Sequence, residues 1–75
     1  MYINENKIAL DNLARNVRNL REKHGYTQQY VCFHAKVDRR TYQKIEKNTP
    51  YDLRFSTLHK LLLFYQVSLK ELIRD

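Results

Sequence analysis

The residues most able to do chemistry lie in the segment DRRTYQKIEK, from Asp38 to Lys47. At about 100° per residue, this segment forms a helix with one polar face and one face made by Thr41, Tyr42 and Ile45. The polar face consists of Arg39, Arg40, Gln43, Lys44 and Lys47. Guanidinium, ammonium and amide groups donate hydrogen bonds to phosphates and base edges. The segment therefore suits a nucleic-acid groove, although an ordinary solvated helix gives a similar pattern.

Other reactive residues do not converge on a site. Cys32 and His34 are two positions apart, so on a helix they point in different directions, whereas zinc needs three or four converging ligands. Redox sensing by Cys32 would need an exposed thiolate. The sequence has no serine–histidine–aspartate pattern, no paired carboxylates and no glycine-rich phosphate loop. We therefore expect no catalytic residue, no metal, no cofactor and no enzymatic activity.

The amino-acid composition limits the kinds of partner that the chain is expected to bind. The 75 residues suffice for one small domain, and 14 Lys and Arg against 8 Asp and Glu give a net charge of +6. This excess attracts polyanions, although an anionic membrane surface or an acidic protein would also fit. The longest apolar run, residues 61–65, is too short to span a bilayer, and the first residues do not resemble a signal peptide. With a single cysteine, the chain fits a reducing cytoplasm.

Apolar periodicity and capping residues predict an all-α chain of five helices. The expected helices span about residues 8–24, 28–35, 38–47, 55–65 and 69–73. Residues 1–7 lack periodicity, and we expect a flexible N-terminal segment there, before a domain over residues 8–75. Thr27 and Asp38 are suited as single caps, whereas Ser68 begins a complete capping box, SLKE.

The fourth expected helix separates core positions from surface positions. The residues expected in the core are Phe55, Leu58, Leu61, Leu62 and Tyr65. Leu63 and Phe64 fall off this face when they are placed at the helical period. The preceding segment NTPYD, residues 48–52, is expected to be a loop because Pro50 cannot continue a helix.

Five segments occur in a fixed order over about residues 10–73. They are LARNVRNLR, GYTQQ, VDRRTYQKIEK, FSTLHKL and VSLKEL. Together they resemble the lambda-repressor/Cro (XRE-type) helix-turn-helix family. The resemblance implies a five-helix lambda-repressor-like DNA-binding domain that regulates transcription by sequence-specific binding of double-stranded DNA. The helix Asp38–Lys47 would be the recognition helix, placed in the major groove.

The resemblance also implies roles for single residues. Arg39 and Arg40 match positions suited to bidentate contact with guanine, Gln43 could read adenine, and Lys44 is a further base-reading candidate. Asp38 is expected to cap the helix and not to read bases. The positions that match phosphate contacts are Gln28, Thr41, Lys47 and Arg54.

A structural ion pair is implied as well. Arg21 and Glu46 match a pair that ties the first helix to the recognition helix, and Arg21 borders the apolar stripe of its helix. Some positions depart from the family pattern. Lys36 and Asn48 replace glycines at helix ends, where left-handed backbone angles are common. Tyr42 replaces a usual isoleucine, and its hydroxyl is a further candidate for a phosphate contact.

Apolar residues near the C-terminus predict a homodimer. The candidates are Leu63, Phe64, Leu69, Leu72 and Ile73. One recognition helix reads few base pairs, so a two-fold dimer on a near-palindromic operator is expected, with its reading helices about 34 Å apart.

A different function would fit the same fold. A protein-interaction module, such as an antitoxin or an accessory factor, could hold its partner through Phe33, Tyr51, Leu63 or Phe64. Salt dependence separates the two, because DNA affinity falls steeply with salt whereas an apolar contact is nearly indifferent to it. RNA binding is the weaker alternative, since the aromatic residues do not suggest a stacking platform.

Overall fold

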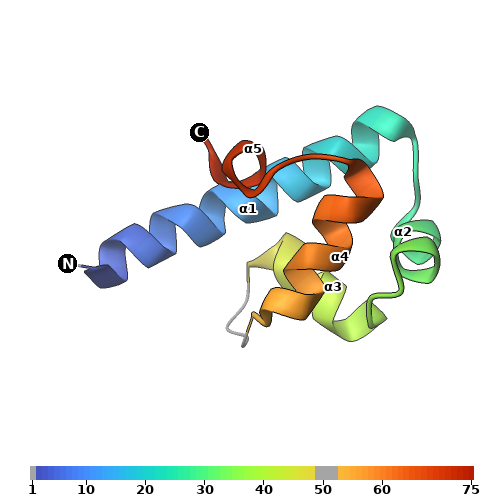
Figure 1. The fold of residues 1–75 in the computed structure, drawn as a ribbon, viewed down its shortest axis with the longest axis horizontal. Coiled ribbons are helices and arrows are strands. Elements are labelled where there is room, and N and C mark those ends of the chain that lie inside the picture. Colours follow the sequence, from blue (N-terminus) through green and yellow to red (C-terminus); the bar gives the residue numbers. More distant parts are fainter. Residues whose placement is uncertain (1, 49–52) are drawn as a thin grey trace.

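The computed structural model describes residues 2–48 and 53–75, with side chains from Lys7 onward. These residues form five α-helices (Figure 1). The helices are α1 (Tyr2–His24), α2 (Gln28–Ala35), α3 (Arg39–Lys47), α4 (Phe55–Tyr65) and α5 (Leu69–Ile73). The predicted all-α, five-helix class is confirmed. Within the described ranges, no helix has the length and apolarity that crossing a membrane requires.

The packing of the helices centres on α1 and α2. Helix α1 packs against α5 and against α3, while α2 packs against α3 and α4. Figure 1 shows α1 running across the molecule, with α5 above it and α3 and α4 below. Residues from all five helices meet in one core. Its most completely buried members are Leu13, Val17, Val31, Tyr42, Ile45, Leu61 and Leu72.

The helix starts follow the predicted capping residues. The Thr27 hydroxyl accepts the Tyr30 N–H at 3.0 Å, without a carboxylate to complete a capping box. The Asp38 carboxylate accepts the Thr41 N–H at 3.0 Å and begins α3. A full capping box at Ser68 begins α5. Each cap satisfies a backbone donor that the first helical turn leaves unpaired.

Left-handed residues end four of the helices. Gly25 ends α1 with φ of 74°, as its lack of a side chain allows. Three residues with side chains adopt similar angles: Lys36 (φ 61°), Asn48 (φ 56°) and Gln66 (φ 56°). Asparagine tolerates this region better than lysine or glutamine does. The turns at Lys36 and Gln66 therefore carry local strain, which the packing of the flanking helices maintains.

The helix start predicted near Ile8 is wrong, because α1 begins at Tyr2. The segment before Ile8 has no apolar stripe, but it contains no proline or glycine to interrupt a helix either. An i,i+4 ion pair between Lys7 and Asp11, at 3.5 Å, crosses the expected boundary. The flexibility expected for residues 1–7 stays a prediction.

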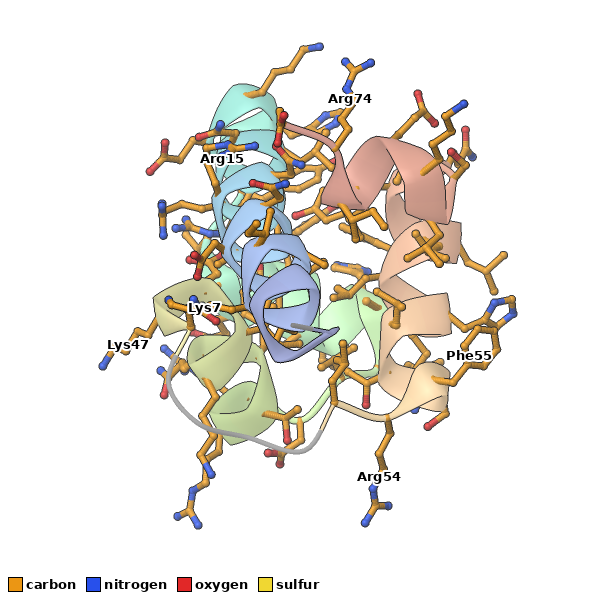
Figure 2. All side chains as sticks on the ribbon, turned by 90° about the vertical axis from the view of Figure 1, so that its left-hand side faces the viewer. Lys7, Arg15, Lys47, Arg54, Phe55 and Arg74 are labelled. Atoms are coloured by element: carbon orange, nitrogen blue, oxygen red, sulfur yellow. The ribbon has the colours of Figure 1, made fainter. Side chains whose placement is uncertain are left out.

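Phe55 is the clear error in the predicted core. Its side chain is 72% exposed and stacks on His59, with ring centroids 5.8 Å apart. Figure 2 shows Phe55 at the outer edge of the molecule. It is the first residue of α4, one turn before the buried Leu58. Of the expected loop over residues 48–52, only Asn48 lies within the described residues.

Replacing Gln66 by glycine should stabilise the fold. Glycine adopts positive φ without the steric strain that a side chain causes. The removal of this strain stabilises the folded state by about 0.5–1 kcal/mol more than the larger loss of backbone entropy destabilises it. Urea denaturation of Gln66→Gly should show a higher midpoint with an unchanged slope. Glu22→Gly, an exposed substitution within helix α1, should change the midpoint in the opposite direction. A lower midpoint for Gln66→Gly would contradict the strain assigned to this turn.

Candidate nucleic-acid interface

Helix α3 has one polar face that is turned to solvent and an opposite face that is fully buried. Tyr42 and Ile45 on the back have no exposed surface. The side chains of the opposite face are Arg39, Arg40, Lys44 and Lys47, which are exposed, and Gln43, which is half-buried. The structure thus brings all four predicted base-reading residues to one face of one helix, as the helical period requires.

The four predicted phosphate-contacting residues divide into two groups. Lys47 and Arg54 are exposed, and Figure 2 shows them extending into solvent from the end of α3 and from the start of α4. Gln28 and Thr41 already have partners within the protein. The Gln28 amide donates to Glu46 Oε1 at 3.0 Å, and the Thr41 hydroxyl donates to Asp38 Oδ2 at 3.3 Å.

The expected pair between Arg21 and Glu46 is present and bidentate. Arg21 Nε lies 2.7 Å from Glu46 Oε2, and Nη2 lies 3.1 Å from Oε1. Only 4% of Glu46 is exposed. Burial raises the pKa of this carboxyl group, but the Arg21 guanidinium, the Tyr42 hydroxyl and the Gln28 amide outweigh it, so the pKa lies below its ordinary value. Glu46 is therefore held as a carboxylate at neutral pH.

Tyr42 does not reach a phosphate, which corrects its predicted role. The residue is completely buried, and burial followed by the neighbouring Glu46 carboxylate raises its pKa. The Tyr65 hydroxyl is buried close by, and burial raises the pKa of Tyr65 to about 12. Neither hydroxyl has a well-aligned hydrogen-bond partner among the described residues. Both phenols therefore stay neutral and belong to the support of α3.

Two further contacts join α1 to the end of α3. Arg18 donates from Nη1 to the Glu46 carbonyl oxygen at 2.9 Å. The Asn48 amide donates to the Asp11 carboxylate. Arg18 lies one turn before Arg21 on α1, and this spacing is the signal in the sequence that could have indicated a shared role. The partner of Asn48 is 37 positions away and has no local signature.

Helix α5 is attached to α1 through its backbone. The Asn12 amide donates to the Ile73 carbonyl oxygen at 3.0 Å, and the Asn16 amide donates to the Leu72 carbonyl oxygen at 2.8 Å. No pattern in the sequence indicated a role for these two asparagines. They satisfy carbonyl groups that the end of a helix leaves without intrahelical partners.

The predicted dimerisation residues do not all lie at the surface. Leu72 is 1% exposed and belongs to the core, because the asparagine contacts turn this side of α5 onto α1. Leu63 is 64% exposed and Leu69 is also exposed, whereas Phe64 and Ile73 are partly buried against the core. Leu72 is therefore removed from the candidate surface.

Cys32 is buried, and burial raises the pKa of its thiol. A neutral buried thiol reacts slowly, so Cys32 acts as a small core residue. Within the described ranges, no three histidine, cysteine, aspartate or glutamate side chains are grouped as a metal site would require.

Comparison with known families identifies this arrangement. The HTH_3 family model, described as helix-turn-helix, matches residues 17–72, well over half of the chain. The chain belongs to the XRE-type helix-turn-helix family. Searches of curated proteins and of solved structures gave no match.

The match spans both helices of the helix-turn-helix motif, α2 and α3, together with α4. The XRE-type helix-turn-helix is a DNA-binding family, and the chain is a DNA-binding helix-turn-helix regulator. Its exposed polar face lies on the second helix of the motif, which in such proteins enters the major groove.

The lowered pKa of Glu46 makes the stability of the fold depend on pH. Because the unfolded chain binds this proton more tightly than the folded one, the contribution of Glu46 is complete above its ordinary pKa, near pH 4.5, and is lost as pH falls through the lower folded value. Glu46→Gln should cost about 3 kcal/mol at neutral pH, at the lower limit for a broken buried pair. As the pH is lowered, the free energy of unfolding of the Glu46→Gln variant should also decrease less steeply than that of the wild type.

Denaturant titrations from pH 7 to pH 3 would measure both effects. Glu22→Gln, which removes an exposed carboxylate of α1, is the matched control and should keep the wild-type profile. Parallel pH profiles for Glu46→Gln and the wild type would show that the buried pair does not contribute in this way.

Proposed function

We propose that the chain regulates transcription by binding a specific site in duplex DNA as a homodimer, with α3 in the major groove. The observation that carries this proposal is the exposed cationic and amide face of α3 on a completely buried back. A helix held in this way keeps its side chains in one orientation, so it can distinguish base sequences.

The proposed reading residues are those near the start of α3. Arg39 and Arg40 donate to guanine, Gln43 pairs with adenine, and Lys44 contacts an acceptor in the same groove. Each bidentate contact provides on the order of 1–3 kcal/mol of discrimination between bases. The Asp38 carboxylate is held by the Thr41 N–H, so it serves as the cap of α3.

The proposed anchoring residues contact the phosphate backbone on both sides of the groove. Lys47 and Arg54 are the exposed cations at the end of α3 and the start of α4. Gln28 and Thr41 are proposed as further phosphate contacts. Their side chains also donate hydrogen bonds within the protein, to Glu46 and Asp38. The net charge of +6 adds a long-range attraction to DNA.

The proposed dimer surface consists of the apolar residues of α4 and α5 that keep exposed area. They are Leu63, Phe64, Leu69 and Ile73. Two copies related by a two-fold axis would place their recognition helices in successive major grooves and would require a near-palindromic site.

Selection of bound duplexes from a random pool should yield two inverted half-sites with centres about 10 base pairs apart. Sedimentation should show a dimer at tens of micromolar protein, or on the selected duplex. Leu63→Lys should weaken both the dimer and the binding to the paired half-sites. A single selected half-site bound by a monomer would contradict the dimer and leave DNA binding intact.

Arg40→Ala should weaken binding to the selected site far more than binding to random DNA, because a base contact is lost. Arg54→Ala should weaken both by similar factors and reduce the salt dependence by about one phosphate contact. Fluorescence anisotropy at several salt concentrations measures both quantities. Equal effects of the two variants on specificity would contradict the division into reading and anchoring residues.

One observation favours a second candidate function, a protein-interaction module such as an antitoxin or an accessory factor. Phe33 on α2 is 77% exposed, and Leu63 also presents apolar surface. A partner held by these residues would bind with little dependence on salt, in contrast to the steep salt dependence of DNA. Of the other two predicted contacts, Phe64 is partly buried against the core and Tyr51 lies outside the described residues.

A further inference from the structure

A hollow of about 530 Å³ lies beside α3, between the α2–α3 turn and the first turns of α4. Four cations line it: Lys36 from the turn, Lys44 from α3, and Arg54 and Lys60 from the start and the middle of α4. They are far apart in the sequence, so no single motif indicated this cluster. Hydroxyl groups from the first turn of α4 also line it, those of Ser56 and Thr57.

The charge in this hollow is not cancelled by its own acidic residue. Asp38 also lines the hollow, where its carboxylate accepts the N–H and the hydroxyl of Thr41 at the start of α3. Its single negative charge is smaller than the combined positive charge of the four cations. All four side chains are exposed to solvent, which lets an incoming anion reach them.

A backbone contact positions Lys60, and the start of α4 contributes to the charge of the hollow. Lys60 Nζ lies 3.0 Å from the Lys36 carbonyl oxygen, which holds the ammonium group at the wall of the hollow. Arg54 occupies the N-cap of α4 but makes no side-chain capping hydrogen bond. The positive end of the α4 dipole, close to Ser56 and Thr57, thus adds to the field of the side chains.

We propose that this hollow binds a phosphate group through Lys36 and Lys60, with Lys44, Arg54 and the hydroxyls of α4 as further donors. A phosphate presents several acceptor oxygens, and it suits a concave set of donors better than a single carboxylate does. Two sources supply this chemistry. One is the DNA backbone beside α3, which rests on the proposed function, and the other is a free phosphorylated molecule that would compete with DNA.

The first experiment measures binding of a random 20-base-pair duplex across a salt series. Lys36→Asn/Lys60→Gln removes two charges, and asparagine suits the left-handed angle at position 36. The slope of log K against log salt should fall by about 0.9 per bound protomer, the value for one phosphate. The matched control is Lys70→Gln/Arg74→Gln, and Figure 2 shows Arg74 at the edge opposite Arg54. It should keep the wild-type slope.

The second experiment uses inorganic phosphate without DNA, at an ionic strength held constant with chloride. The amide resonances of Ser56 and Thr57 should shift in a saturable manner for the wild type and the control, and not for Lys36→Asn/Lys60→Gln. Circular dichroism checks that both double variants remain folded. Should Lys60→Gln unfold the chain, Lys36→Asn alone decides the result.

A reduced salt slope without a phosphate-induced shift assigns the hollow to the DNA backbone. A saturable shift without a change of slope assigns it to a free phosphorylated molecule, and both effects together support a site open to either. An unchanged slope and no shift overturn the proposal, even if Arg40→Ala still abolishes preference for the selected site. If the wild type binds no DNA, the proposed function fails, and the phosphate titration still decides what the hollow binds.

Discussion

The buried carboxylate of Glu46 imposes the strictest constraint on this fold. A charge removed from water must be matched by donors in a narrow range of positions, otherwise it destabilises the folded state strongly. Arg21 from α1 supplies two hydrogen bonds and Gln28 from α2 supplies a third. Because Glu46 lies on α3, these bonds define the position of α3 relative to two other helices. The apolar core alone would tolerate small rotations of α3 more readily.

The same constraint connects the interior to the binding surface. Tyr42 and Ile45 fill the back of α3, and the Arg18 guanidinium holds the carbonyl oxygen of Glu46. With its back and its C-terminal end attached, α3 cannot turn without breaking several contacts at once. The orientation of the α3 face that carries Arg39 and Arg40 is thereby set by contacts at the back and at the C-terminal end of the helix. Specific reading of bases requires such support, since a bidentate contact depends on fixed geometry.

Local patterns in the sequence predicted most of the architecture. Helical periodicity and the caps at Thr27, Asp38 and Ser68 located the helices, because these effects act within one or two turns. The errors came from features that depend on distant neighbours. Phe55 matches the apolar period but lies past the edge of the core. The Tyr42 hydroxyl was expected to reach a phosphate, although the whole residue is buried.

In the candidate site too, features that depend on local sequence were predictable, whereas features that depend on the packing of distant segments were not. Periodicity alone placed the four proposed base-reading residues on one face, whereas the hollow lined by Lys36 and Lys60 arises only when the turn and α4 meet. The engagement of Gln28 with Glu46 likewise depends on the packing of α2 against α3. The family resemblance supplied the Arg21–Glu46 pair, which no rule of spacing would have given.

The attachment of α5 has a consequence for how such regulators can diversify. Asn12 and Asn16 hold main-chain oxygens of this helix, and of its own side chains only Leu72 is fully buried. Main-chain oxygens are the same whatever residues carry them. The outward positions of α5 can therefore accumulate substitutions while the helix stays docked. Related chains could in this way acquire different surfaces on α5 without altering α3, which carries the exposed polar face.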